Sequence, residues 1–387
     1  MVHYATLLSM AEAILKAPID LNKHTCLIYA EGVFGLEVRK NLPMRAKTAD
    51  GILRYAEYKI TGVIDSSCSE KTTGEVLSVY LLGTFPGRNR GEVPIFHTLK
   101  EAKAKTSADV LILGNAPEGG ELPEKYKKDI VWAIKNKMHI VSGTHYILNE
   151  DKKFSKLAKK YGVMLWDTRK APDLKCITVG SAKAYHIKKP IVLTVGMDAA
   201  IGKMTVAYEM DRAAKKLGLA SCVVPTGQTA MMISGWGVAI DALPADFMAG
   251  AVEQMVLEKS KKYDILFVEG QGSLFHPAYA NTTIALIHGA VPTHMIIVVR
   301  PQRKHSIGSK LVKLPDIKRA IAQYENSVLP FYRNAKVIAV AVNSEGLDEA
   351  ARERYKKEVQ HECGLPAFDA LYDEDIVFDV VKKIAQD

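Results

Sequence analysis

Cysteine and long apolar runs are both scarce in this chain of 387 residues. The five cysteines are scattered and form no Cys-x-x-Cys pair: Cys26, Cys68, Cys176, Cys222 and Cys363. We therefore expect reduced thiols and no metal site. No apolar run is long enough to span a bilayer, and the first residues lack the basic and apolar segments of a signal peptide. These absences favour a cytoplasmic protein with no membrane partner.

A continuous basic block is also missing, although 52 Lys and Arg outnumber 43 Asp and Glu to give a net charge of +9. Basic residues are interleaved with acidic ones, as in segment 352–358, and there is no long basic block with interleaved aromatic residues. Nucleic-acid binding is therefore not expected. The charge suits an anionic small molecule or a solvated lysine-rich surface.

Apolar strand segments alternate with helical segments along the whole chain. The strand segments are 25–30, 59–65, 109–115, 139–145, 163–167, 191–195, 219–224, 263–269, 294–300 and 336–343. This alternation predicts an α/β fold with parallel, doubly wound sheets. The length exceeds one ordinary core, so we predict one domain over residues 1–180, a linker over 181–190 and a second domain over 191–387.

A glycine-bounded loop carrying a lysine follows the strand at 191–195. The loop reads Gly196-x5-Gly202-Lys203-Met204-Thr205, and a helix is expected to begin at its end. Successive backbone N–H groups and the positive end of the helix make such a loop an anion cradle, and the lysine adds a full charge. The stretch therefore predicts phosphate binding. Met204 occupies the place of the usual metal-binding hydroxyl, and Thr205 is turned about 100° away along the helix.

Asp198 lies inside this loop, where a carboxylate repels phosphate unless it has another task. It is a candidate for binding a metal or a substrate amine, or for acting as a base, and the alternative is a turn-forming aspartate. Glu269 ends the strand at 263–269, as in the second half of a phosphate-loop site, and two nearby glycines suit close approach to a ligand. His276 is either a general base or a hydrogen-bonded, partly buried histidine.

Other strand ends also carry polar residues. Residues 226–230 are expected to be a loop that contacts substrate or phosphate, continuing through residue 241. Arg169 follows the strand at 163–167, at the edge where doubly wound sheets bind ligands. Asp65 ends the strand at 59–65 and either holds a ribose hydroxyl or caps the following turn. The turn at 31–35 is not a Gly-x-Gly-x-x-Gly fingerprint.

These blocks together resemble a two-domain bacterial and archaeal family long known as a domain of unknown function. The matching blocks are 46–49, 63–66, 116–120, 167–170, 195–205, 226–229, 246–253 and 269–279. The resemblance covers nearly the whole chain and implies a Rossmann-like domain followed by a P-loop NTPase-like domain. The family includes D-glutamate N-acetyltransferases, which use acetyl-CoA, and the resemblance implies this activity. The chain departs from them at Met197, Ala199 and Ala230, where Thr, Cys and Gly are usual.

The resemblance implies a set of site residues for an acetyl-CoA-dependent N-acetyltransferase. The loop residues that would hold the CoA phosphates are Gly196, Met197, Gly202, Lys203, Met204 and Thr205. With Lys203 fixing the carrier, Asp198, Glu269 or His276 would take the proton of the substrate ammonium. The substrate-binding candidates are Thr226, Gly227, Gln228, Thr229, Gln271, Gly272, Arg169 and Lys47. Backbone N–H groups near Gly227 or Gly272 would stabilise the oxyanion of the tetrahedral intermediate. Arg169 or Lys47 would bind the carboxylates of the substrate.

Two other functions remain open at this point. A shorter resemblance to dethiobiotin synthetase, carried by Gly-x-Asp-x3-Gly-Lys and Glu-Gly-x-Gly, favours an ATP/Mg²⁺-dependent ligase or kinase with Glu269 and Asp198 on the metal. A ligand-sensing or NAD(H)-binding module without turnover is the third. For the enzyme readings, we expect a small-molecule substrate and a homo-oligomer.

Overall fold

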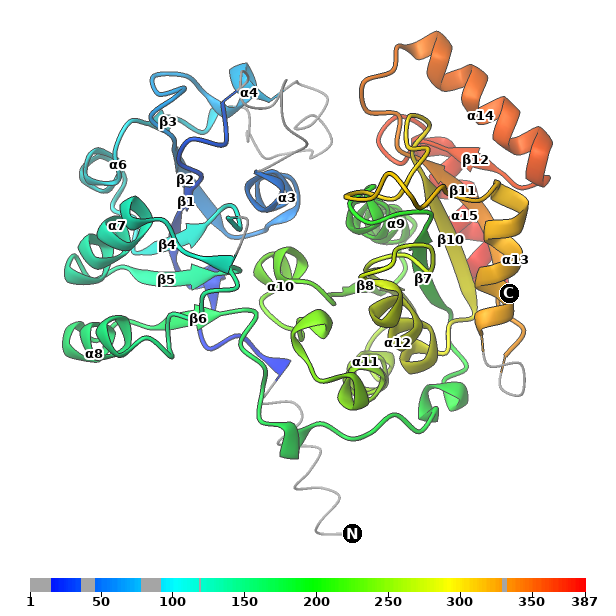
Figure 1. The fold of residues 1–387 in the computed structure, drawn as a ribbon, viewed down its shortest axis with the longest axis horizontal. Helices are drawn as coiled ribbons and strands as arrows, with labels where there is room; N and C mark the ends of the chain where they lie inside the picture. Colours follow the sequence, from blue (N-terminus) through cyan, green and yellow to red (C-terminus); the bar gives the residue numbers. More distant parts are fainter. Residues whose placement is uncertain (1–14, 36–45, 78–91, 118–119, 329–332) are drawn as a thin grey trace. The chain divides into compact units, whose positions relative to one another are not determined.

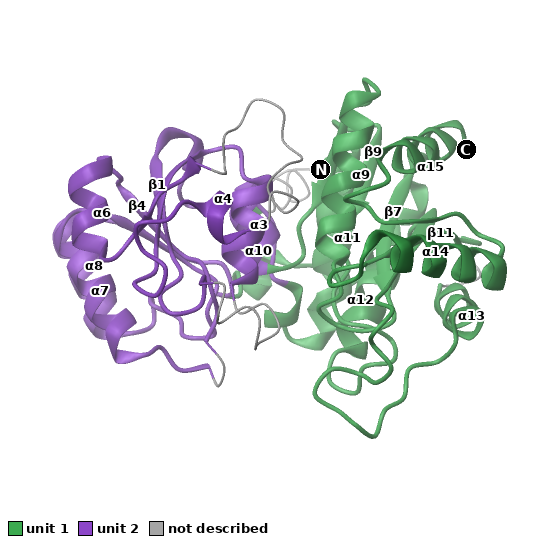
Figure 2. Ribbon diagram, turned by 90° about the horizontal axis from the view of Figure 1, so that it is seen from above, with its two compact units in different colours: residues 1–15, 171–227, 240–387 green, residues 16–170, 228–239 purple. Residues whose placement is uncertain are grey.

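The computed structural model describes residues 15–35, 46–77, 92–117, 120–328 and 333–387 (Figure 1). Residues 118–119, which belong to the matching block at 116–120, lie outside them. Two compact units are present (Figure 2). Unit 1 holds Ala171–Gly227 and Ile240–Asp387, with Leu15, and unit 2 holds Lys16–Lys170 and Gln228–Ala239. The domain boundaries that we predict from the sequence, at residues 180 and 191, stay a prediction.

Unit 2 is built on a parallel sheet with the strand order β3-β2-β1-β4-β5-β6. Its strands are β1 (Thr25–Tyr29), β2 (Lys59–Ile64), β3 (Ile95–Phe96), β4 (Val110–Leu113), β5 (His139–Ser142) and β6 (Leu165–Asp167). Its helices are α3 (Lys47–Tyr55), α4 (Thr73–Val76), α6 (Leu99–Thr106), α7 (Glu124–Lys135) and α8 (Lys152–Tyr161). Right-handed crossovers put α3 and α4 on one face and α6, α7 and α8 on the other. This is the Rossmann-like order, with its switch point between β1 and β4.

Unit 1 contains a second parallel sheet, in the order β12-β11-β10-β7-β9-β8. Its strands are β7 (Ile191–Gly196), β8 (Ser221–Val224), β9 (Ile265–Val268), β10 (His294–Val299), β11 (Lys336–Val342) and β12 (Ala367–Phe368). Its helices are α9 (Lys203–Lys216), α11 (Ala245–Ser260), α12 (Ala280–Ala290), α13 (Ile317–Ser327), α14 (Glu349–Cys363) and α15 (Glu374–Gln386). The crossover rule puts α9 on one face and α11 to α14 on the other, and α15, which follows the last strand, packs against α9.

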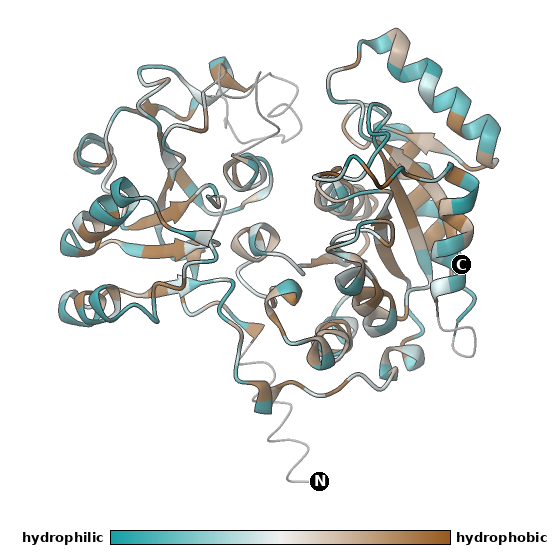
Figure 3. Cartoon of the chain, in the orientation of Figure 1, coloured by the Kyte–Doolittle hydropathy of each residue, from teal (hydrophilic) through white to brown (hydrophobic). Residues whose placement is uncertain are grey.

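The strands of both sheets are apolar on both sides because helices cover both faces. Every residue of β4, β7, β9 and β8 is buried, and Figure 3 shows the strands as brown bands between mixed teal and brown helices. The predicted α/β fold with two parallel sheets is therefore confirmed. The carboxyl ends of the strands carry the polar residues, so each sheet presents its candidate site at one edge.

The loop predicted to begin at residue 226 is wrong over residues 228–234. They form the helix α10 (Gln228–Ser234), which packs against α3 within unit 2. The hydroxyls of Thr48 and Thr229 are hydrogen-bonded at 3.1 Å, and Ala17 N–H donates to the carbonyl of Gly235 at 3.0 Å. The buried side chains of Met231 and Met232 explain the helix, because they bring apolar surface to a segment that reads as polar at its start.

Candidate functional site

The phosphate loop joins β7 to α9 inside unit 1. Gly202, the residue before the helix, has φ +103°, a backbone conformation that L side chains rarely adopt. Gly202 brings no side chain to cap the backbone N–H groups at the start of α9, and such groups bind anions. Lys203 is only 5% exposed, and its Nζ donates to the carbonyl oxygen of Asp198 at 2.7 Å. The ammonium is thus held inside the loop, next to the place where a phosphate would bind.

Two residues that are distant along the chain, Tyr324 and Asn343, hold the loop in shape. The buried Tyr324 of α13 donates from its hydroxyl to the carbonyl of Gly196 at 2.6 Å and accepts from the N–H of Leu274 at 3.2 Å. Burial raises the pKa of this hydroxyl. Asn343, which follows β11, donates from Nδ2 to the carbonyl of Ile201 at 2.9 Å. A polar strand end was a visible signal for Asn343, whereas Tyr324 lies in a helix without any motif.

Glu269 lies at the end of β9, beside the loop strand. Its Oε2 accepts the N–H groups of Thr226 and Gly227, both at 2.9 Å, and its carbonyl accepts the Thr226 hydroxyl at 2.7 Å. Burial raises the pKa of this carboxyl to about 6, against the opposing effect of the two N–H donors. Because the Gly227 N–H is bound to Glu269, it does not face an oxyanion in this conformation.

The glycines after Glu269 make close approaches to the chain itself. A Cβ at Gly270 would lie 1.6 Å from the carbonyl oxygen of Thr194 and 3.0 Å from Cδ of Lys203. Gly272 has φ +64°, and a Cβ there would lie 2.4 Å from the carbonyl oxygen of Tyr279. These glycines therefore let the strand ends and the lysine pack together. Similarly, a Cβ at Gly227 would lie 2.3 Å from Nε2 of Gln271.

Asp198 and His276 both hold residues 303–314, which we call the basic hairpin. The Asp198 carboxylate, fully buried, accepts Nη1 of Arg303 at 3.0 Å, the N–H of Ile307 at 2.8 Å and the hydroxyl of Ser306 at 3.3 Å. The ring of His276 donates from Nε2 to the carbonyl of Ile307 at 3.0 Å and accepts the Ala278 N–H on Nδ1 at 3.1 Å. Both ring nitrogens of His276 are therefore engaged, which favours its structural interpretation.

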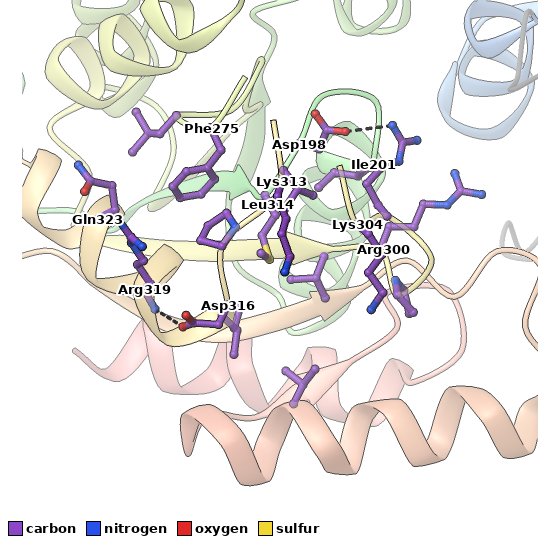
Figure 4. A pocket seen from close by; sticks show the side chains of 18 of the residues that line it. Asp198, Ile201, Phe275, Arg300, Lys304, Lys313, Leu314, Asp316, Arg319 and Gln323 are labelled. Carbon is purple, nitrogen blue, oxygen red and sulfur yellow. Dashed lines mark hydrogen bonds and ion pairs between the residues drawn. The ribbon is translucent and has the colours of Figure 1, made fainter. Parts of the chain in front are cut away.

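A cavity of about 1100 Å³ opens beside the phosphate loop within unit 1 (Figure 4). Its walls come from the loop, from residues 274–275, from the basic hairpin and from α12, α13 and α14. In Figure 4 Asp198 lies at one side, and Phe275 projects from the ribbon among the other lining side chains. The cavity joins an apolar wall to cationic side chains, which suits a ligand with both an apolar body and negative charge.

The remaining candidates lie in unit 2. Arg169 donates from Nη1 to Oε1 of Gln228 at 3.1 Å, and both side chains are partly exposed. Lys47 begins α3 and is exposed. Gln228 and Thr229 lie in the first turn of α10, whereas Thr226, Gly227, Gln271 and Gly272 belong to unit 1. The chain thus passes from one group of candidates to the other between residues 227 and 228.

Asp65 binds the turn at 31–35, which follows β1 at the switch point of the Rossmann-like sheet. Its fully buried carboxylate accepts the N–H groups of Gly32 at 3.1 Å, Phe34 at 2.7 Å and Gly35 at 3.3 Å, and also the N–H and hydroxyl of Ser67. In a dinucleotide site these loop N–H groups face a pyrophosphate and the acid faces a ribose. Here they bind each other, which favours the structural interpretation of Asp65.

Two negative findings concern the part of the chain that the structure describes. No group of three or more His, Cys, Asp and Glu side chains is arranged to hold a metal ion there. No described helix combines the length and the apolar character needed to cross a bilayer.

Comparison with known proteins identifies the family. Residues 178–377 match the P-loop domain of a domain of unknown function, DUF1611, and residues 82–171 match its Rossmann-like N-terminal domain. The chain belongs to the DUF1611 family. A crystal structure of a DUF1611 protein from Anabaena variabilis superposes with a TM-score of 0.82 at 34% identity, covering 93% of this chain and 99% of that one. The resemblance inferred from the sequence blocks is therefore confirmed.

Two curated relatives carry an activity. A D-glutamate N-acetyltransferase of Tritonibacter scottomollicae is 35% identical over 278 residues, which cover 70% of this chain and 80% of the relative. A second D-glutamate N-acetyltransferase, from a Pseudoalteromonas species, is 32% identical over 271 residues with the same coverage. This DUF1611 protein is accordingly an enzyme of the N-acetyltransferase class.

Proposed function

We propose that this DUF1611 protein transfers an acetyl group from acetyl-CoA to the amino group of D-glutamate. The two relatives support the acceptor, and the geometry of unit 1 supports the donor. The observation that carries the proposal is the position of the phosphate loop beside Glu269. The side chain of Lys203 passes next to Gly270, the residue after Glu269, so an anion cradle and a buried carboxylate meet at one sheet edge.

Each part of this arrangement has a task in acetyl transfer. Acetyl-CoA supplies the acetyl group and a diphosphate. The first turn of α9 and the ammonium of Lys203 bind that diphosphate and thereby fix the donor in one orientation. Neither task needs a divalent metal, so Met204 in the place of a metal-binding hydroxyl is compatible with the reaction.

Glu269 is the best candidate for the general base. An ammonium group must lose its proton before the nitrogen can act as a nucleophile. A carboxyl with a pKa of about 6 is ionised at neutral pH and is a stronger base than an ordinary glutamate. Its Oε2 is fixed by Thr226 and Gly227, which leaves Oε1 as the oxygen that takes the proton. Asp198 and His276 bind the basic hairpin instead and act as positioning residues.

Arg169 and Lys47, which belong to unit 2, stay predictions for binding a carboxylate. A guanidinium matches a carboxylate with two parallel hydrogen bonds, and Arg169 already presents one nitrogen to the amide of Gln228. Replacing Arg169 with lysine is expected to raise KM for D-glutamate while the affinity for CoA stays unchanged.

The test measures release of the CoA thiol with acetyl-CoA and D-glutamate, together with thermal shifts for CoA and for ATP with Mg²⁺. We expect turnover, stabilisation by CoA, and loss of turnover in Glu269→Gln with CoA binding retained. Stabilisation by ATP with Mg²⁺ and no response to CoA would contradict the proposal and favour a ligase or kinase.

A further inference from the structure

The basic hairpin carries more positive charge than the proposed reaction uses. Its twelve residues contain four Lys and Arg and no Asp or Glu. Arg303 is paired with Asp198, which leaves the exposed Lys304 and Lys313 lining the cavity and Lys310 outside its lining. Among the described residues, neither Lys304 nor Lys313 makes an ion pair. The two ammonium groups therefore add positive charge to a cavity whose lining also holds the acidic side chains of Asp198, Asp316, Glu358 and Glu362.

The hairpin is held in a defined position. The N–H of Leu314 donates to the carbonyl of Lys304 at 3.0 Å, the N–H of Ser306 donates to the carbonyl of Val312 at 2.9 Å, and His305 and Lys313 form an antiparallel bridge. Asp198 holds the whole turn against the phosphate loop. The backbone of the basic hairpin is therefore fixed beside the phosphate loop, and Lys304 and Lys313 line the cavity that the loop also lines.

The rest of the cavity is suited to a flat apolar body. Phe275 lies in its wall and packs edge-on against Tyr324, with ring centroids 5.7 Å apart, and Leu274 and Leu314 add aliphatic surface. Met197, Asp198 and Ile201 of the phosphate loop line the same cavity, so the two spaces are continuous. The acidic side chains of the lining other than Asp198 are Asp316, Glu358 and Glu362, which come from α14 and the start of α13.

We propose that this cavity holds the nucleoside of the acyl carrier, with Lys304 and Lys313 binding a phosphate that lies outside the diphosphate. The inference rests on the proposed function and specifies it: the phosphate is the 3′-phosphate of CoA, and the hairpin makes the enzyme selective for the 3′-phosphorylated carrier. Lys304 and Lys313 both line the cavity, and cationic side chains attract a dianionic phosphate.

The experiment compares CoA with 3′-dephospho-CoA. Dissociation constants are measured by calorimetry on the full chain, for the wild type, for the double variant Lys304→Gln/Lys313→Gln and for Lys310→Gln as the matched control. We expect the wild type to bind CoA at least about tenfold more tightly, since one charge-assisted contact is worth about 1.5–3 kcal/mol. In the double variant the preference falls to within about twofold, because CoA binds more weakly while 3′-dephospho-CoA binds as before. Lys310→Gln keeps the preference.

Two results would overturn the inference: equal affinity of the wild type for both carriers, or an equal loss for both in the double variant with an unchanged circular dichroism spectrum. Turnover separates this failure from failure of the proposed function. If acetyl-CoA and acetyl-3′-dephospho-CoA serve D-glutamate equally well, only the selectivity is wrong. If neither carrier binds and no thiol is released, the acetyltransferase proposal fails and the selectivity fails with it.

Discussion

The carboxylate of Asp198 lies 3.0 Å from Nη1 of Arg303, so the acid inside the phosphate loop is already neutralised by a cation from the basic hairpin. This pair resolves an apparent conflict in the sequence. A buried carboxylate in a phosphate cradle would repel an anionic ligand, but here the Asp198 carboxylate binds the basic hairpin.

Removing Arg303 tests this role. Arg303→Ala leaves the Asp198 carboxylate with only the Ile307 N–H and the Ser306 hydroxyl, and we expect a loss of about 1–3 kcal/mol in the free energy of unfolding. Urea denaturation measures it. Arg300→Ala is the control, because Arg300 pairs with the exposed Glu345 at 3.2 Å and such a pair contributes about 0–1 kcal/mol. Equal free energies of unfolding for the two variants would count against this role of Arg303.

The pH dependence of turnover tests Glu269. A base works only when deprotonated, so kcat/KM is expected to rise with pH through about 6, the raised pKa of this carboxyl, and to level off above it. Glu269→Gln should lower kcat by about 10²- to 10⁴-fold and remove this limb from what activity remains. Asp198→Asn should retain the limb. A limb that persists unchanged in Glu269→Gln would assign the base elsewhere.

Lys203 and Lys216 offer a matched pair on α9. Lys203 begins the helix inside the loop, whereas Lys216 ends it and pairs with Glu374 at the surface. Lys203→Ala should raise the dissociation constant for CoA by about 10- to 100-fold, the value of a charged hydrogen bond. Lys216→Ala should leave it unchanged. The phosphate-loop assignment is wrong if calorimetry finds the same affinity for both variants.

The hydrogen bonds of Asp65 predict that unit 2 does not bind a dinucleotide. Because its carboxylate occupies the loop N–H groups that a dinucleotide would need, millimolar NAD⁺ is expected to give no thermal shift. Asp65→Ala should lower the free energy of unfolding by about 2 kcal/mol or more, because several buried N–H groups lose their hydrogen-bond acceptor. Asp109→Ala, which loses contacts to Thr25 and His24 at a more exposed site, should cost less. Saturable NAD⁺ binding would reopen the ribose interpretation.

The sequence by itself determined the α/β class, the two parallel sheets and the phosphate loop. Strands covered on both faces read as apolar runs, and a glycine-bounded loop with a lysine is a local pattern. Glu269 was predictable for the same reason, because an acid at the end of such a strand is a position in a pattern. The edge strands β3 and β12 were not predicted, because two residues are too few to show the alternation of a strand.

Only the tertiary structure decided the hydrogen-bond partners of Asp198, His276 and Tyr324. The partner of Asp198 lies 105 residues further along the chain, and Tyr324 reaches Gly196 across 128 residues. The helix α10 likewise depended on packing against α3. Sequence patterns report the spacing of neighbours along the chain, whereas these hydrogen bonds depend on which segments the crossovers bring to one sheet edge. The local pattern therefore specified the phosphate cradle, and the fold specified which acids remain available for chemistry.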